Sequence, residues 1–556
     1  MPRPTAPFTP AAGRLWPPRR VWITLASLAT ATLLVRAGLL EMVAGSIVDQ
    51  AVRNIITLIL AFAGLMSLLV WFLRESGHPA GLKRGVGWGL VALVLAAVAS
   101  LRIERVSGDL VPEFRFRWSQ SPDRMLPAAT PEAGVAGSWQ ATPSDFPRFL
   151  GPDGSAAIPG PALDPDWKAR PPERRWRVSL GAGWSGFATC GDHAVTLEQR
   201  GDEELVTCRS IATGDLTWGV AVRARHATVL GGVGPRSTPT IRDGVVFSTG
   251  ATGWLHAIDG ATGTVAWKKN VLADLGIDPE AHAAAVTWGR AGSPLVTSDL
   301  VIVPGGGPLF KPGPGGAKAV SLVAYDRATG QRRWTAGTEQ ISFVTPVVVQ
   351  VAGREVVLTV NEARVVAYDP ADGRELWGFP WPGNSNSDAT CSQARVLADG
   401  RIFISKGYGI GAAVFAAADG GDQPAFNGAW RQPGMLKTKF TNVVINDGHA
   451  YGLSDGILEC VRLADGVRRW KKGRYGQGQI LQVGGLLIVQ AESGEVVLVD
   501  CDPERHVERA RLEAISGQTW NNPCLAGDLL LVRNAEEAAC YRLPVVGKIA
   551  ADGDHE

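Results

Sequence analysis

The sequence predicts an all-β fold, an eight-bladed β-propeller, preceded by N-terminal transmembrane helices. Three observations lead to this prediction. Three long apolar stretches fall within the first hundred of the 556 residues. The next four hundred residues repeat a short motif that ends in Trp, and Trp is the commonest aromatic residue, with 19 copies against 16 Phe and 6 Tyr. Gly (67) and Pro (36) are frequent but follow no collagen period, which is typical of many short strands joined by turns.

The charge balance excludes two classes of protein. The chain has 55 basic and 53 acidic side chains, a formal net charge of +2, and only 19% of its residues are charged. A strongly basic nucleic-acid binder would have a large positive net charge, and an acidic disordered chain would have a large negative one. We therefore expect no nucleic-acid partner.

Each apolar stretch is long enough to cross a bilayer, which takes about 17 to 25 residues. The stretches are Val21–Leu40, which Arg36 interrupts, Ile55–Leu73 and Gly85–Leu101. We predict a cytoplasmic N-terminus over residues 1–20 and a membrane region over residues 21–102 with helices at 21–40, 55–73 and 85–101. The first stretch has an alternative interpretation as a signal peptide, because basic residues precede its short apolar core.

Basic residues suggest the orientation, since Lys and Arg gather in cytoplasmic loops. Such residues precede the first stretch and follow the second: Arg3, Arg14, Arg19, Arg20, Arg74, Lys83 and Arg84. The predicted location is therefore the inner membrane, multi-pass, with the propeller on the periplasmic side. One observation opposes this orientation, because four arginines follow the third stretch on its outer side: Arg102, Arg105, Arg115 and Arg117.

The remaining boundaries follow from composition. Residues 103–145 contain five prolines and little periodicity, which predicts a semi-extended linker or a loosely packed wrap on the next domain. Residues 146–544 form the predicted propeller, and residues 545–556 form a polar tail.

The propeller prediction rests on an internal repeat. A short strand leads to Gly, three residues and then Trp, and successive Trp residues lie 49, 67, 43, 53 and 40 positions apart. A period near 40 to 50 residues with four strands per unit is typical of propeller blades. The inner strands are expected to begin at Ser185, Ser237, Ser293, Thr345, Ser392, Thr441, Gln479 and Asn521. The eighth unit lacks an outer strand, which Arg175–Ser179 can supply, so that no sheet edge stays open.

The repeat carries a family resemblance. Ala257–Trp267 and Ala324–Trp334 match the tryptophan-docking pattern A-x-D-x-x-T-G-x-x-x-W, and Ala367–Trp377 departs from it only at Asp372. The chain resembles the pyrroloquinoline-quinone-type eight-bladed propeller proteins, and the segment Phe149–Gly154 resembles the lead of their membrane-anchored group.

The motif residues are expected to be architectural. Gly permits the left-handed turn between third and fourth strands, Trp packs on the next blade, and Asp bonds turn amides. The docking residues are Gly214, Trp218, Asp259, Gly263, Trp267, Asp326, Gly330, Trp334, Asp369, Gly373, Trp377, Gly466 and Trp470.

Cysteine usage bears on the cofactor. Cys208, Cys460 and Cys540 occupy the slot that Ala257 and its equivalents fill, so we expect small buried thiols there. The resemblance implies that enzymatic members hold the quinone beside a disulfide between adjacent Cys, with Ca²⁺ and an Asp base. No two Cys are adjacent in this chain, and no matching cluster of Asp, Glu and Asn is evident. We therefore predict no cofactor and no metal, with pyrroloquinoline quinone and calcium as the alternative.

A binding site is expected where long loops share one face of the propeller. These loops are 219–236, 268–292, 304–319 and 379–391. Polar and aromatic residues assigned to this face are Glu198, Arg200, Arg236, Trp288, Arg290, Lys406, Lys439, Trp520 and Asn521. Such a set fits a small polar ligand or a peptide edge, although the same side chains could simply solvate the mouth and bond loop carbonyls.

The sequence thus favours a membrane-tethered, non-catalytic binding or scaffold module outside the cytoplasm, with a protein partner or a small polar ligand at its loop-rich face. No catalytic residue is assigned. The alternative is a membrane-bound quinoprotein dehydrogenase that uses pyrroloquinoline quinone and calcium, because helices ahead of a propeller also occur in that class.

Overall fold

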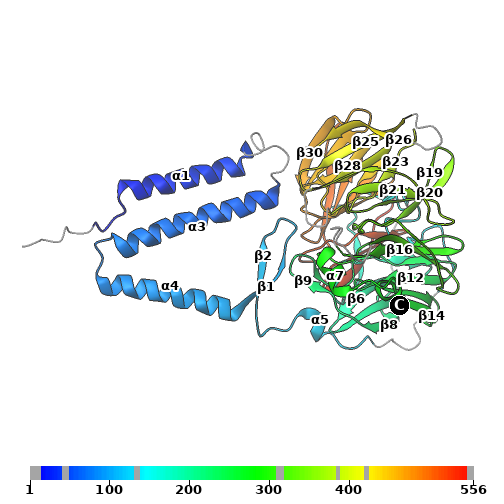
Figure 1. The fold of residues 1–556 in the computed structure, drawn as a ribbon, viewed down its shortest axis with the longest axis horizontal. Helices are drawn as coiled ribbons and strands as arrows, with labels where there is room; N and C mark the ends of the chain where they lie inside the picture. Colours follow the sequence, from blue (N-terminus) through cyan, green and yellow to red (C-terminus); the bar gives the residue numbers. More distant parts are fainter. Residues whose placement is uncertain are drawn as a thin grey trace, which may run out of the picture. The chain divides into compact units, whose positions relative to one another are not determined.

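The computed structural model describes residues 14–39, 49–129, 138–308, 319–383, 389–418 and 425–547. The chain divides into two compact units, residues 1–119 and residues 120–556. The first contains three long helices and a β-hairpin, and the second is the propeller (Figure 1).

The helices of the first unit are α1 (Arg19–Arg36), α3 (Gln50–Arg74) and α4 (Ala80–Ser100). Asp49 caps α3 by accepting a hydrogen bond from the Val52 N–H at 2.9 Å. Of the helices in the described part of the chain, α3 and α4 are long and apolar enough to cross a membrane. The first predicted span is a helix that ends at Arg36 and carries three arginines, and it is not among these two candidate spans.

The linker differs from the extended tether that its prolines suggested. Residues Leu101–Val106 (β1) and Pro112–Phe116 (β2) pair as an antiparallel hairpin in the first unit. In the second unit, the short helix α5 (Pro122–Met125) and the segment from Ser138 onward pack on the first blade, where the Ser138 N–H donates to Asp192 at 2.8 Å. The alternative of a packed wrap therefore describes the second half of the linker.

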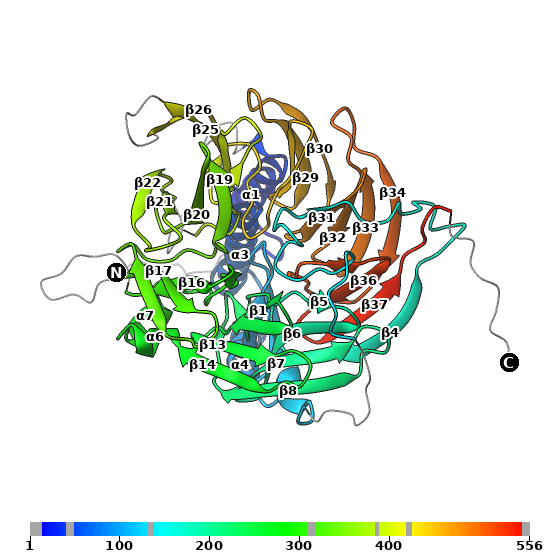
Figure 2. The same ribbon diagram turned by 90° about the vertical axis from the view of Figure 1, so that its right-hand side faces the viewer.

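The propeller has eight blades, as the repeat predicted, and each contains four antiparallel strands (Figure 2). Blades 1 to 4 are β5 (Ala188–Cys190), β6 (His193–Arg200), β7 (Glu203–Ser210) and β8 (Leu216–Arg223); β11 (Thr240–Arg242), β12 (Val245–Thr249), β13 (Trp254–Asp259) and β14 (Val265–Asn270); β15 (Leu295–Val296), β16 (Leu300–Gly306), β17 (Val320–Asp326) and β18 (Arg332–Ala336); β19 (Val347–Val351), β20 (Arg354–Val360), β21 (Arg364–Tyr368) and β22 (Glu375–Pro380).

Blades 5 to 8 are β23 (Arg395–Val396), β24 (Ile402–Lys406), β25 (Gly411–Ala418) and β26 (Ala425–Gln432); β27 (Val444–Asn446), β28 (His449–Ser454), β29 (Ile457–Arg462) and β30 (Arg468–Arg474); β31 (Gln479–Val483), β32 (Leu486–Gln490), β33 (Glu495–Asp500) and β34 (Glu508–Glu513); β35 (Cys524–Ala526), β36 (Leu529–Arg533), β37 (Glu537–Arg542) and β4 (Glu173–Ser179). Most inner strands begin two or three residues later than predicted. The predicted closure is confirmed, because β4 from the start of the propeller pairs with β37 at its end.

Each outer-strand Trp contacts the next blade in a repeated way. The indole N–H of Trp218 donates to the Gly260 carbonyl at 2.7 Å, and a Cβ on Gly263 would lie 2.7 Å from the Trp218 ring, so glycine is required there. Equivalent indole-to-carbonyl bonds join Trp267 to Arg327, Trp334 to Pro370, Trp430 to Leu463 and Trp470 to Asp502.

The motif Asp residues hold the turns that these Trp residues cover. The Asp259 carboxylate accepts from the Thr262 N–H at 2.9 Å, Asp326 accepts from Thr329 and Asp369 accepts from Ala371. Trp377 is buried against Phe426 of the next blade.

A second set of hydrogen bonds crosses every blade seam near the channel axis. Residues that precede or begin the inner strands bond one another in sequence: Gly186 to Thr238, Thr238 to Ser293, Ser293 to Thr345, Gln393 to Thr345 and to Asn442, Gln479 to Phe440 and to Trp520, and Asn521 to Ser185. The ring is therefore held at its inner circumference by polar bonds and at its outer circumference by Trp.

The segment Phe146–Ile158 lies across the channel at the ends of the inner strands. The Phe146 and Pro147 carbonyls accept from Thr189 and Ile241 in blades 1 and 2, and Arg395 in blade 5 donates to the Gly154 carbonyl at 2.8 Å. Ala157–Ile158 (β3) then pairs in parallel with β31 in blade 7. This segment therefore joins four blades by way of their inner strands.

Candidate functional site

The candidate site is the mouth of the channel, where the inner strands begin. Two of its long connections contain structure that the sequence did not predict. The connection between blades 1 and 2 forms a small hairpin, β9 (Ala227–Thr228) and β10 (Gly232–Val233). The connection between blades 2 and 3 holds α6 (Val271–Asp274) and α7 (Pro279–Ala285). The other two predicted loops fall partly outside the described residues, at 309–318 and 384–388.

Three predicted site residues lie at the seam between blades 8 and 1. Glu198 is fully buried, accepts from the Gly181 N–H and is 3.0 Å from an Arg200 guanidinium nitrogen. Arg200 also donates to the Pro127 carbonyl at 2.9 Å. Asn521 is buried and donates to the Ser185 carbonyl at 2.8 Å.

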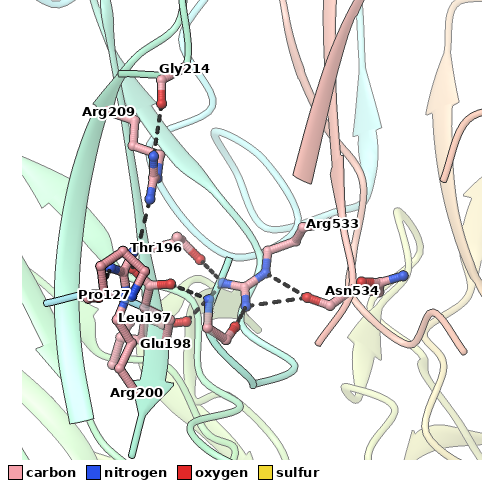
Figure 3. A network of polar contacts seen from close by, with 10 residues as sticks. Pro127, Thr196, Leu197, Glu198, Arg200, Arg209, Gly214, Arg533 and Asn534 are labelled. Atoms are coloured by element: carbon pink, nitrogen blue, oxygen red, sulfur yellow. Dashed lines mark hydrogen bonds and ion pairs between the residues drawn. The ribbon is translucent and has the colours of Figure 1, made fainter. Parts of the chain in front are cut away.

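Arg533, which sequence reasoning missed, completes this network (Figure 3). It reaches from β36 in blade 8 into blade 1 and donates to the Thr196 hydroxyl at 2.6 Å and the Leu197 carbonyl at 2.8 Å. Burial lowers the pKa of Arg533 to about 10, while the charge of Glu198 acts to raise it. These charged groups join the two ends of the ring.

Two more predicted cations also bond backbone carbonyls. Arg236 donates to the Gly231 carbonyl at 2.5 Å and to the Gly234 carbonyl. Arg290 is buried and donates to the carbonyls of Pro304 and Gly305. Burial lowers the pKa of Arg236 to about 9 and that of Arg290 to about 10. Both arginines hold loops at the mouth.

The two predicted lysines are buried as well. The Lys406 ammonium donates to the Trp381 carbonyl at 3.0 Å. The Lys439 ammonium lies 3.6 Å from an Asp455 carboxylate oxygen. The interpretation that polar mouth residues bond loop groups therefore describes these side chains better than ligand contact does.

Aromatic residues form two clusters at the mouth. Trp520 contacts Trp184 with ring centroids 4.7 Å apart and Phe440 at 4.8 Å, both with tilted rings, which brings blades 1, 6 and 8 together. Trp288 contacts Phe343 at 5.6 Å and Tyr408 at 6.5 Å, across blades 3 to 5. Trp288, Trp520, Phe440 and Tyr408 are only partly buried. Aromatic side chains therefore contribute to the surface that remains open at the mouth.

Glu204 is a buried acid that sequence reasoning also missed. It points from β7 in blade 1 to blade 2, where its carboxylate accepts from the Ala251 N–H at 2.9 Å. Burial raises the pKa of Glu204 to about 7, although the Ala251 bond and the charge of Arg236 act to lower it. The only sequence signal is a charged pair, Glu203–Glu204, at the start of an apolar strand.

The donor groups do not fit the quinone and calcium of the enzymatic relatives. Among the residues that the structure describes, no group of three or more His, Cys, Asp and Glu side chains is placed to hold a metal ion. Glu198 and Glu204 lie in blade 1 and Asp455 lies in blade 6, and each has its own partner. All seven Cys are free. Burial lowers the pKa of His226 and of His282 to about 3, so both are neutral.

Comparisons with known proteins extend this picture. A 155-residue part of the chain is 29% identical to the quinohemoprotein alcohol dehydrogenase ADH-IIG of Pseudomonas putida. The match covers 26% of this chain and 19% of that enzyme, so the chain spans about a fifth of its curated relative.

Solved structures with a similar fold include BamB from Moraxella catarrhalis, at 14% identity and a TM-score of 0.46 over 67% of this chain and all of that one. They also include the ADHIIG enzyme from Pseudomonas putida HK5, at 12% identity and a TM-score of 0.48 over 74% of this chain and 82% of that one. The quinohemoprotein alcohol dehydrogenase of Comamonas testosteroni gives 14% identity and a TM-score of 0.48 over 73% and 82%.

A protein-family model matches residues 169–472, more than half of the chain and most of the propeller. The protein therefore belongs to the family described as outer membrane protein assembly factor BamB.

Proposed function

We propose that this protein is a membrane-tethered, non-catalytic propeller that binds a protein partner at its loop-rich face. The observation that carries the proposal is the β9–β10 hairpin. Its tip exposes two adjacent apolar side chains, Val229 at 46% and Leu230 at 37% of their surface. Exposed apolar groups beside partly buried aromatic residues are typical of protein interfaces.

The hairpin is held in place by the mouth residues themselves. Arg236 bonds its carbonyls, and the Trp184 indole donates to the Gly231 carbonyl at 2.7 Å while its ring packs on Gly232. The Thr228 hydroxyl accepts from the Gly231 N–H at 2.9 Å. A preorganised knob loses little conformational entropy on binding, which favours recognition of a partner groove.

The tether and its orientation are part of the proposal. Helices α3 and α4 are apolar enough to span the inner membrane, and the basic residues around them favour a periplasmic propeller. Fusion of a periplasm-dependent phosphatase after Glu556 should give an active reporter, and fusion of a fluorescent protein that matures only in the cytoplasm should stay dark. The reverse pattern would contradict this orientation.

Photo-crosslinking in native membranes tests the partner site. A photoreactive residue at Val229 should yield a discrete adduct with another protein. The matched control is Val467, which is also 46% exposed but lies in a turn between third and fourth strands of blade 6. Equal crosslinking at both positions, or none at Val229, would contradict the proposed binding face.

The alternative, a quinoprotein dehydrogenase, is favoured by the identity to the Pseudomonas enzyme and opposed by the donor groups described above. Titration of the full chain with pyrroloquinoline quinone and Ca²⁺ separates the two functions. A ligand at a hundredfold excess over its Kd adds about 2.7 kcal/mol to the free energy of unfolding. A saturable, Ca²⁺-dependent rise in melting temperature would support the dehydrogenase, and we expect none.

A further inference from the structure

The hairpin β1–β2 of the first unit has two chemically different faces. In its register, Leu101 lies opposite Phe116 and Ile103 opposite Phe114, so these four side chains share one face of the ribbon. Trp118 follows on the same face and stacks on Phe116 with ring centroids 4.9 Å apart. The apolar face of the hairpin, as we call it, consists of Leu101, Ile103, Phe114, Phe116 and Trp118.

Most of this face is exposed within its own unit. Ile103, Phe114, Phe116 and Trp118 expose 45%, 61%, 50% and 69% of their surface. An isolated two-stranded hairpin is marginally stable in water, and exposed aromatic surface adds to its cost. The face therefore needs an apolar surrounding.

The opposite face is polar and satisfies its own charges. The Arg102 guanidinium lies 2.8 Å from the Glu104 carboxylate, and Arg105 lies 2.7 Å from Glu113. These pairs account for two of the four arginines that stand on the outer side of the third predicted span.

The hairpin is fixed to one end of the helices. Helix α4 passes into β1 without an intervening residue, since Ser100 ends the helix and Leu101 begins the strand (Figure 1). Arg117 donates from its backbone N–H to the Ser100 carbonyl at 2.8 Å and from its side chain to the Val98 carbonyl at 3.0 Å.

The turn of the hairpin is tied to the other two helices. The Asn54 amide near the start of α3 donates to the Asp109 carbonyl at 3.0 Å, and Arg36 at the end of α1 donates to Asn54 at 3.0 Å. The hairpin thus lies across three helix ends that face the same side.

From this geometry we infer that the apolar face of the hairpin lies in the lipid headgroup region of the leaflet where α4 leaves the membrane. Aromatic side chains concentrate at that depth, where one end is apolar and the other wet. The hairpin cannot go deeper, because its open strand edges carry backbone groups that need water or headgroups. The inference rests on the proposed membrane tether and names the bilayer interface as a second contact beside the spanning helices.

The experiment uses the full chain in vesicles of equal parts phosphatidylethanolamine and phosphatidylglycerol. An environment-sensitive fluorophore is attached at Phe114→Cys or, as the matched control on the other face, at Glu113→Cys. The unsubstituted chain is labelled in the same way, and its signal gives the background from the native Cys. Quenching is then measured with a nitroxide on the lipid chain near the headgroup and with iodide in the water.

We expect lipid-nitroxide quenching at position 114 to be several-fold stronger than at position 113, and iodide quenching to show the reverse order. Position 114 open to iodide would overturn the inference. Position 114 shielded from both quenchers would also overturn it, because the propeller or a second copy would then cover the face.

Flotation and alkaline carbonate extraction keep the two proposals apart. A chain that resists extraction but lacks lipid quenching at position 114 refutes only the hairpin contact. A chain that is released by carbonate refutes the membrane tether and the hairpin contact together.

Discussion

The indole N–H of Trp176 donates a hydrogen bond to the carbonyl oxygen of Ile211 over 2.7 Å. Trp176 lies on β4, the strand that the start of the propeller contributes to blade 8, and Ile211 follows β7 in blade 1. The closing seam of the ring therefore has the same indole-to-carbonyl bond as five other seams. It also has a glycine, Gly214, against the Trp ring, as four of those five seams do.

Replacing Trp176 should weaken this seam. Trp176→Ala should lower the free energy of unfolding by about 3 to 5 kcal/mol, because it removes a large buried ring. Trp176→Phe retains most of the ring area and loses the hydrogen bond, so its loss should be about 1 kcal/mol. Urea unfolding of the detergent-solubilised chain, followed by fluorescence, measures both. Equal losses in the two variants would contradict the packing argument.

The docking glycines offer a test with an internal control. Gly263 has φ of 72°, and a Cβ there would meet the Trp218 ring at 2.7 Å, whereas Gly353 has φ of 76° and nothing within 4 Å. Gly353→Ala should cost about 1 kcal/mol of backbone strain. Gly263→Ala adds a clash worth about 1 to 3 kcal/mol. Melting temperatures of the two variants compare these costs, and a larger effect at Gly353 would refute the close approach.

Glu204 should make stability depend on pH. Its folded pKa of about 7 lies above its ordinary value of 4.5, so the folded state binds the proton more tightly than the unfolded state. Its contribution is fully present below pH 4.5 and is lost as the pH rises through 7. Glu204→Gln should therefore be more stable relative to the parent chain at pH 8 than at pH 5, by up to about 3 kcal/mol. A difference that is constant across this range would show that Glu204 titrates normally.

The seven Cys should remain thiols. Cys208, Cys460 and Cys540 are fully buried, and burial raises the pKa of Cys460 and of Cys540 to about 12. A thiol held protonated and out of solvent reacts slowly with alkylating reagents. Mass spectrometry should find these three unmodified in the folded chain, and all seven alkylated after unfolding without a reductant. Fewer than seven would reveal a disulfide.

The sequence predicted the features that repeat. The spacing of Gly214 and Trp218, copied from blade to blade, indicated the outer contacts, and the repeated starts of the inner strands indicated the number of blades. Both were predictable because each copy is read from a few neighbouring residues. The pairing of β4 with β37 was also predictable. The last unit lacked an outer strand, and the strand that contains Trp176 precedes the first unit without belonging to it.

The residues of the candidate site were harder to predict. Arg533 looks like the last residue of an apolar strand, and only its contacts with Thr196 and Leu197, more than 300 positions away, show that it is buried. Lys406 and Arg290 were assigned to the mouth by strand order. The sequence does not show that Lys406 donates a hydrogen bond to the Trp381 carbonyl and Arg290 to the Pro304 carbonyl. Which polar group faces solvent depends on long-range packing that no local pattern records.

The pairing of β4 with β37 also sets an order in time. Arg177 on β4 forms its ion pair with Glu537, and 360 positions separate the two. A ribosome makes the chain from its N-terminus, so β4 emerges early and waits for its partner until the last strands have appeared. Until then, β4 has no strand to pair with, and blade 7 has no eighth blade to pack against. The nascent propeller is thus an open arc with two unprotected ends, and pairing with other chains in this interval is its main hazard.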